Sequence, residues 1–276
     1  MKQALHIFLA IGLLLAVLFS CSTEKNTLIS RSYHGLNAHY NGYFNATELL
    51  RESMTAYRSN RVENYYNILP IDPMPNEDEV IGMYPAIDTA ITKCKKVIRD
   101  HSMPSNDRPS KKKEEHNKWI DENWTTIGIA SYYRRDYEGA LKSFKFVRKF
   151  YRNDPSLYIG ELWMAKTYIA QGDYVKAKFN LDNLDKAIAD EQERSNEKKS
   201  KKSKKDEEKI AKFPKKIRFR LELTKAELAM IKEDREGAIT ALESAVEHAR
   251  MNDNKARVHF ILGQLYAEKG NTDKAY

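Results

Sequence analysis

The sequence has few of the residues that build covalent frameworks or reaction centres. Among 276 residues there are two cysteines, Cys21 and Cys94, which excludes a small domain held by several disulfides. Glycine-rich phosphate loops and nucleophile elbows are absent from the sequence. His34 and His39 lie five residues apart, so they lack the i, i+4 spacing of helical metal sites. We therefore expect a protein that is not an enzyme and binds no metal, cofactor or small-molecule substrate.

The apolar run that the chain does have lies at its start. Residues 1–20 carry one cation, Lys2, and then a charge-free run from Ile7 to Phe19, which is typical of a secretory signal and short for a membrane span. The following Leu18-Phe19-Ser20-Cys21 resembles the bacterial lipobox, in which the cysteine thiol receives a diacylglycerol. The alternative is an ordinary signal with an incidental cysteine. We expect lipidation at Cys21, with residues 21–30 as the tether.

The residues after the cysteine bear on localisation. Ser22 and Thr23 follow it and no aspartate stands directly after it, which in Gram-negative lipoproteins fits sorting to the outer membrane. We expect a lipid anchor in the cell outer membrane with the body on the periplasmic face. Glu24 and Lys25 leave an exterior orientation open.

The formal charge of +8 raises the question of nucleic-acid binding. Much of the charge density lies in residues 190–213, where nine cations face seven acids. No aromatic residue interleaves the lysines of 198–205, so a base-stacking platform is absent. We expect a solvated, disordered insertion and no nucleic-acid partner. Contact with anionic headgroups is a second interpretation of these lysines.

Four copies of a short signature give the chain its organisation. They are Asp136-Tyr-Glu-Gly-Ala140, Asp173-Tyr-Val-Lys-Ala177, Asp234-Arg-Glu-Gly-Ala238 and Asn271-Thr-Asp-Lys-Ala275. Their alanines lie 37, 61 and 37 residues apart, and the long interval contains the lysine-rich insertion. A constant period interrupted once is typical of a solenoid, which presents a surface to other proteins.

The residues around the signatures resemble the tetratricopeptide pattern of two-helix repeats. We therefore expect an all-α tetratricopeptide solenoid, in which small residues lie where helices cross and large ones fill the gaps between hairpins. The fourth copy stops inside its second helix, from which we expect a chain that belongs to a longer protein. The predicted structural residues are Trp124, Gly128, Ala140, Phe144, Tyr168, Gly172, Ala177, Ala238, Gly263, Tyr266, Gly270 and Ala275.

In such arrays the first helix of each repeat lines a concave groove. Alignment on the signature alanines places a set of aromatic, cationic and amide side chains there. Aromatic and arginine positions are where interface energy tends to concentrate. The predicted protein-binding residues are Tyr132, Tyr133, Lys166, Arg257 and Gln264.

The segment before the repeats is rich in tyrosine and asparagine. Apolar positions from Tyr33 to Met54 recur every three or four residues, which predicts a helix of about 25 residues with an aromatic stripe. Residues 68–75 contain three prolines and must be extended. Residues 84–100 predict a second helix that pairs with the first and caps the solenoid. The predicted domains are residues 1–20 (signal), 21–30 (tether), 31–118 (helical module), 119–189 (repeats one and two), 190–213 (insertion) and 214–276 (repeats three and four).

The lipobox cysteine, the block from Tyr33-His34 to Tyr43-Phe44-Asn45 and the repeats together resemble the PorW/SprE family of Bacteroidetes outer-membrane lipoproteins. The resemblance spans Cys21 to the end, and the block is its specific part. It implies a periplasmic scaffold for type IX secretion and, in gliding species, motility. The implied partners are secretion-system ring, motor and translocon subunits.

Two rival functions remain open. One is a lipoprotein that helps to assemble outer-membrane β-barrel proteins, which usually lacks a Tyr/Asn helix before its repeats. The other is a glycan-capturing lipoprotein of the SusD kind, which builds its sugar platform on long aromatic-bearing loops. The largest insertion in this chain has no aromatic residue before Phe213, which counts against glycan capture.

Overall fold

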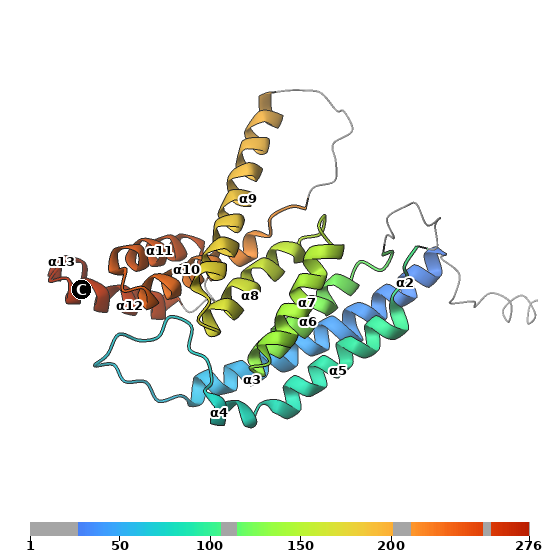
Figure 1. Ribbon diagram of the computed structural model, residues 1–276, viewed down its shortest axis with the longest axis horizontal. Helices are drawn as coiled ribbons and strands as arrows, with labels where there is room; N and C mark the ends of the chain where they lie inside the picture. The colour runs from blue at the N-terminus through green and yellow to red at the C-terminus, as the bar shows by residue number, and fades with distance from the viewer. Residues whose placement is uncertain (1–26, 106–114, 201–210, 251–254, 276) are drawn as a thin grey trace, which may run out of the picture.

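The computed structural model describes residues 27–105, 115–200, 211–250 and 255–275, and over these ranges the chain is helical without a β-strand (Figure 1). Short turns join consecutive helices into hairpins. The hairpins are α6 (Ile120–Tyr133) with α7 (Tyr137–Phe150), α8 (Ser156–Ala170) with α9 (Tyr174–Ser200), α10 (Arg218–Ile231) with α11 (Arg235–His248), and α12 (Lys255–Glu268) with α13 (Thr272–Ala275). The predicted all-α, tetratricopeptide-type fold is confirmed.

Each signature forms the turn inside one hairpin. Its first residue accepts a hydrogen bond from the backbone N–H three residues later, which satisfies a free donor at the start of the second helix. The residue just before each signature has a positive φ, of 76° at Gly172 and 73° at Gly270. Arg135 and Glu233 hold φ values of 65° and 60° at the equivalent positions, although side chains disfavour this conformation. The signature therefore encodes a turn and a helix cap.

The predicted structural residues lie at the contacts between and within hairpins. At Gly128 an added Cβ would overlap the ring of Phe144, so α6 and α7 cross closely only because this position is glycine. Trp124 packs against Phe146 with ring centroids 4.4 Å apart. Gly263 approaches the Ala275 carbonyl in the last hairpin. Buried completely or nearly so are Ala140, Phe144, Tyr168, Ala177, Ala238 and Tyr266.

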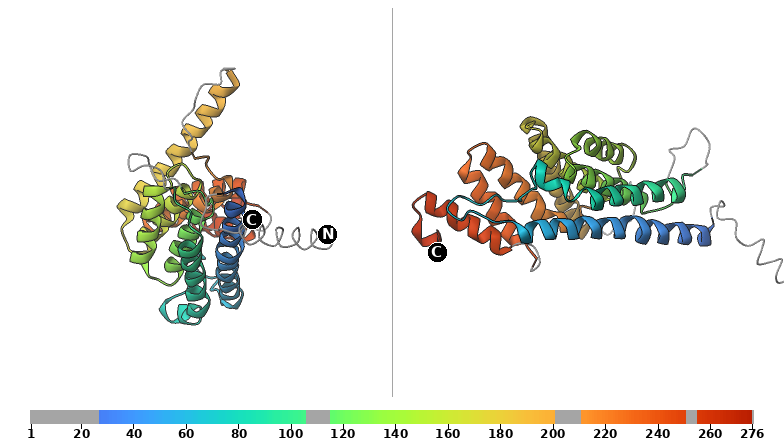
Figure 2. Two further views of the ribbon diagram at one scale, coloured as in Figure 1. Left: turned by 90° about the vertical axis from the view of Figure 1, so that its right-hand side faces the viewer. Right: turned by 90° about the horizontal axis from the view of Figure 1, so that it is seen from below.

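The N-terminal module is built on one long helical rod. It consists of α2 (Leu28–Asn37), the π-helical segment η1 (Ala38–Phe44) and α3 (Asn45–Asn60), and it runs along one side of the molecule in the right-hand view of Figure 2. The predicted second helix is α5 (Tyr84–His101), which follows the short α4 (Glu77–Ile81). Because α5 contacts both the rod and α6, the module covers the N-terminal end of the repeats.

The rod fits closely against the first repeat. The Nδ2 of Asn123 on α6 donates to the Ala38 carbonyl at 3.0 Å, inside the π-helical segment. An added Cβ at Gly42 would overlap Asn123, so glycine is required at this crossing. The described residues contain no helix that is both long and apolar enough to cross a membrane. Cys21 and the lipobox lie outside the described residues.

The predicted disordered insertion at residues 190–213 needs correction at both ends. Helix α9 continues to Ser200, and Figure 1 shows its end projecting from the body. Glutamate, glutamine, lysine and arginine are strong helix formers, and nothing in the sequence stops the helix earlier. Ala211 and Phe213 are buried in the core. The central part of the insertion, residues 201–210, lies outside the described residues.

Replacing Glu233 by glycine tests the turn geometry. Glu233 is exposed and its φ is 60°, so we expect Glu233→Gly to raise the free energy of unfolding by about 0.5–1 kcal/mol. Urea denaturation followed by circular dichroism measures the change. Gly172→Ala is the matched control and should destabilise, because it introduces the same strain. Destabilisation by Glu233→Gly would show that the side chain contributes more than the strain costs.

Candidate functional site

The groove of the repeats is occupied by part of the chain itself. Residues 61–76, which we call the strap, connect α3 to α4 and pass along α8, α10 and α12 (Figures 1 and 2). Pro70, Pro73 and Pro75 keep the strap from forming a helix, as predicted. The predicted connector therefore fills the surface on which we expected a partner.

The strap is held at its centre by a buried cluster of charges. Asp72 accepts a hydrogen bond from the Lys166 Nζ at 2.8 Å and from an Arg58 guanidinium nitrogen at 2.7 Å. The Lys166 Nζ also lies 3.6 Å from Glu227 of α10. The Lys166 side chain is 1% exposed and that of Asp72 is 11% exposed. The cluster thus joins α3, the strap, α8 and α10.

The charges in this cluster depend on one another. Burial by itself would raise the pKa of the Asp72 carboxyl, but the positive charges of Lys166, Arg220 and Arg58 outweigh it and hold that pKa well below its usual value. Burial by itself would lower the pKa of Lys166, and the negative charges of Asp72 and Glu227 raise it instead. Both partners of the pair are therefore charged at neutral pH.

In its N-terminal half, the strap is held by hydrogen bonds from α12 to its backbone. Arg257 of α12 donates to the Pro70 carbonyl at 2.7 and 3.1 Å and pairs with Glu63 at 2.7 Å. Gln264, two turns further along α12, accepts from the Leu69 N–H at 3.0 Å and donates to the Asn67 carbonyl at 2.7 Å. Paired contacts with an N–H and a carbonyl are the way in which an amide side chain recognises an extended backbone.

Apolar contacts complete the seat of the strap. Leu69 and Ile71 are buried with α10, α11 and α12 in one hydrophobic cluster. Met74 packs instead against the larger cluster, which is formed by the N-terminal module, the first two repeats and part of α10. The strap therefore contributes to two hydrophobic clusters, and α10 likewise supplies residues to both of them.

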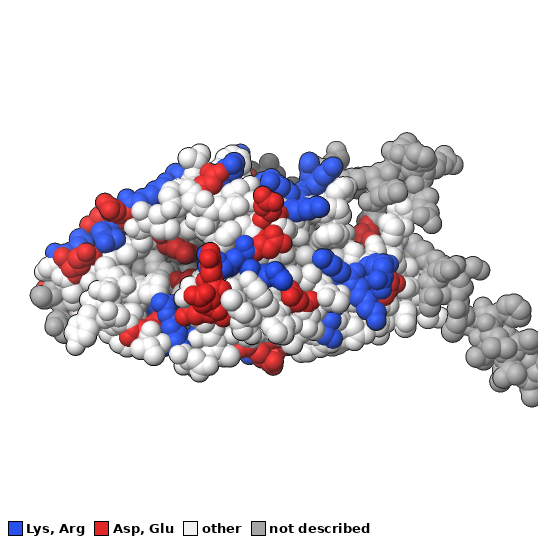
Figure 3. Space-filling view, turned by 60° about the horizontal axis from the view of Figure 1, so that its bottom comes forward, with Lys and Arg blue, Asp and Glu red and all other residues white. Residues whose placement is uncertain are grey.

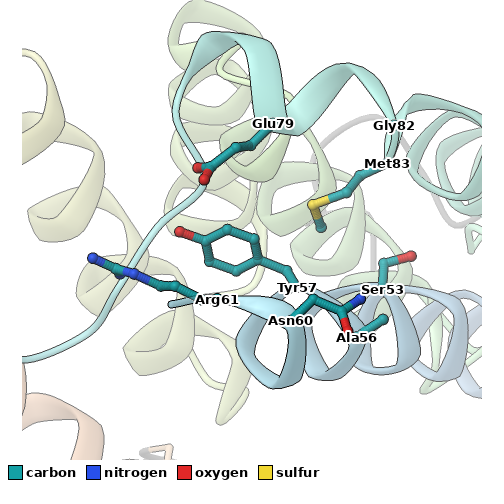
Figure 4. Close-up of a pocket in the computed structure, with 8 residues that line it drawn as sticks. All are labelled: Ser53, Ala56, Tyr57, Asn60, Arg61, Glu79, Gly82 and Met83. Carbon is teal, nitrogen blue, oxygen red and sulfur yellow. The ribbon is translucent and has the colours of Figure 1, made fainter. Parts of the chain in front are cut away.

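Where the strap joins the N-terminal module, an open pocket of about 420 Å³ lies between α3 and α4. Figure 4 shows the Tyr57 ring within it, between Glu79 and Arg61. The Tyr57 hydroxyl donates to the Met74 carbonyl at 2.9 Å, which ties the end of α3 to the returning strap. The pocket is lined by Ser53, Ala56, Tyr57, Asn60, Arg61, Glu79, Gly82 and Met83.

The predicted protein-binding residues lie along the groove, but their contacts are with other parts of the same chain. Lys166, Arg257 and Gln264 contact the strap directly. Tyr132 and Tyr133 are buried and meet Trp163 of α8 edge-on. Sequence reasoning missed Asp72, Arg58 and Glu227; an acid within a proline-rich connector was the signal that could have found the first of them.

A second buried polar cluster lies at the start of α6. Asp121 accepts a hydrogen bond from the Ser156 hydroxyl at 2.5 Å. One carboxyl oxygen of Glu122 is buried without a hydrogen-bond partner among the described residues. Burial and the adjacent Asp121 raise the pKa of Glu122 to about 9. The Asp121–Glu122 pair therefore keeps a proton to a higher pH than a free glutamate does.

The surface carries charges of both signs. Figure 3 shows lysine and arginine side chains interspersed with aspartate and glutamate over one face. Several of these form exposed pairs, such as Arg51 with Glu48 at 2.6 Å and Lys178 with Asp182 at 2.7 Å. Interspersed charge produces a weaker field than a single-sign patch of the same size.

No family model and no curated protein matches the chain. Among solved structures, it is similar to MamA (MamA MSR-1 C2), at 14% identity and a TM-score of 0.37, over 72% of this chain and 87% of that one. It is also similar to BtubC (BKLC) from P. vanneervenii, at 10% identity and a TM-score of 0.45, over 84% and 85%.

Replacing Asp72 by asparagine tests the central cluster. Asp72→Asn leaves the Lys166 charge buried without its closest partner, and we expect a loss of about 3–5 kcal/mol in unfolding free energy. The double variant Asp72→Leu/Lys166→Met removes both charges and should lose less. Asp185→Asn, at the exposed pair with Lys225, is the control and should change stability by less than about 1 kcal/mol. Equal small losses in all three variants would contradict the cluster's role.

The raised pKa of Glu122 predicts a pH dependence of stability. Between its ordinary pKa of 4.5 and about 9, the folded protein retains a proton that the unfolded chain has released. Stability should therefore fall as pH rises through this window, and Glu122→Gln should flatten the decline. Urea denaturation at pH 5, 7 and 9 measures both slopes. Glu48→Gln, on the exposed face of α3, is the control; an unchanged slope in Glu122→Gln would contradict this assignment.

Proposed function

We propose that this chain is a non-catalytic scaffold lipoprotein of the type IX secretion system, anchored in the outer membrane through acylated Cys21 with its body in the periplasm. In this role it joins secretion-system ring, motor or translocon subunits and supports protein secretion and, in gliding species, motility. The helical-repeat fold is one generally used for protein–protein interaction. The identity of the system comes from the sequence resemblance.

The observation that carries the proposal is the Tyr/Asn block before the repeats. The block forms α2 and η1, whose inner face fits against α6 through Ala38 and Gly42. Its outer face presents Tyr40 and Asn41 to solvent. Repeats alone occur in many unrelated scaffolds, whereas this block distinguishes the resemblance to PorW/SprE from the β-barrel assembly rival, and the insertion without an aromatic residue before Phe213 counts against the SusD rival.

The occupied groove adds a restriction to where partners bind. Because the strap already satisfies Lys166, Arg257 and Gln264, a partner that used these residues would first have to displace it. Displacement would expose the buried charges of Lys166 and Asp72. We therefore assign partner binding to the outer surfaces of the helices, including the projecting part of α9.

A crosslinked pull-down from the organism's own cells tests the proposal. We expect the wild-type chain to recover ring, motor or translocon subunits, because a scaffold holds several of them at once. Cys21→Ala should recover less, because without acylation the protein is no longer concentrated at the membrane. Thr23→Ala, which keeps the cysteine, is the matched control and should behave as wild type.

Other recoveries would contradict the proposal. A SusC-like transporter as the sole partner would favour glycan capture, and saturable oligosaccharide binding by the purified protein would support that rival. Recovery of β-barrel assembly components alone would favour the other. Equal recovery of ring, motor or translocon subunits by Cys21→Ala would show that partner binding does not depend on the lipid anchor, and would contradict that part of the proposal.

A further inference from the structure

The N-terminal rod carries an apolar stripe that the rest of the described chain leaves largely exposed, with Tyr33 meeting His101 of α5 edge-on. Its residues recur at intervals of four, three, four and four, which places them on one face of the helix. Each is between 46% and 77% exposed, although large apolar side chains in such a row are normally buried. The stripe consists of Ile29, Tyr33, Leu36, Tyr40 and Phe44.

The stripe ends abruptly along the rod. The same face continues in α3 with Glu48 and Arg51, which form an exposed ion pair, and with the exposed Thr55. The uncovered apolar surface is thus confined to residues 29–44, the part of the rod nearest Cys21 in the chain. The rod therefore fits an environment that is apolar along residues 29–44, close to the anchor, and that gives way to water from Glu48 onward.

Packing on the opposite face fixes the rod's orientation. Ser30, Ala38, Gly42 and Ala46 recur every four or eight residues and are buried. Asn123 fills the space beside Gly42 and bonds to the Ala38 carbonyl. The rod cannot turn its stripe inward without losing these contacts, so the stripe faces away from the body.

We propose that this stripe lies in the interface of the lipid bilayer to which Cys21 is anchored; the inference rests on the proposed lipidation. Seven residue steps separate Cys21 from Leu28, which span about 25 Å at full extension. The first turn of the rod therefore stays closer to the acylated residue than the roughly 30 Å thickness of the hydrocarbon core. Tyrosine rings favour this depth, because their apolar body enters the acyl region while the hydroxyl remains among the headgroups.

Contact between the stripe and the bilayer would fix the orientation of the protein relative to the membrane. Acyl chains on one residue hold a protein at the membrane but let it pivot about the tether. A stripe of sixteen helical residues is about 24 Å long, and its contact with the bilayer stops that pivoting. The repeats would then project from the membrane at one angle, which a scaffold for membrane-embedded partners requires.

A depth measurement on the acylated full-length protein tests the stripe. Leu36→Cys is labelled with the environment-sensitive dye NBD, and the protein is reconstituted in vesicles of phosphatidylethanolamine and phosphatidylglycerol with brominated acyl chains. Cys94 does not compete for the dye, because it is buried and burial raises its pKa to about 12. Thr55→Cys, on the same face beyond the ion pair, is the matched control. Circular dichroism checks that both variants fold.

We expect the brominated lipids to quench the dye at position 36 at least threefold more than at position 55. Equal, weak quenching at both positions in acylated protein would overturn the stripe proposal alone. A dye at position 36 that is shielded without lipid, in a protein that light scattering shows to be dimeric, would assign the stripe to a second copy and overturn it too. If the intact mass shows that the protein carries no acyl chains, the lipid anchor at Cys21 is absent, and the proposed anchoring and the stripe proposal are both overturned.

Discussion

The ion pair between Lys166 and Asp72 is the contact on which the arrangement of this molecule depends. It lies where the strap, the second repeat and the third repeat meet, and each charge is stabilised by the other. A buried charge left without a partner is costly, so the position of the strap and the packing of α8 against α10 are coupled. The lysine-rich insertion separates these two repeats in the sequence. The strap, which precedes both of them in the chain, contacts both and so connects them.

This coupling changes how the groove is to be understood. An extended peptide seated by Arg257 and Gln264 has the form of a bound ligand, yet here it belongs to the same chain. The N-terminal module and the fourth repeat are thereby joined across nearly two hundred residues. We interpret the groove as a structural joint, because the strap already satisfies the side chains that line it.

Much of the repeat architecture could be predicted because it is local. The Asp234 cap and the buried Ala238 lie within one turn of each other, and each signature forms its hairpin turn independently. The helix from Tyr84 and the extended prolines were also predictable from residues close in sequence. The length of α9 was not, because helix propensity in a charged segment competes with disorder, and composition alone does not decide between them.

The sequence by itself determined the fold class, the period, the turns and the extended state of the strap, because backbone preferences and neighbouring side chains set these. Only the tertiary structure decided where the strap lies. Asp72 and Lys166 are far apart in sequence, and pairing between such residues leaves no periodic signal in one chain. The same holds for the stripe: the spacing of Tyr33, Leu36 and Tyr40 predicted an aromatic face, but only packing determined that Ala38 and Gly42 turn inward and leave that face exposed.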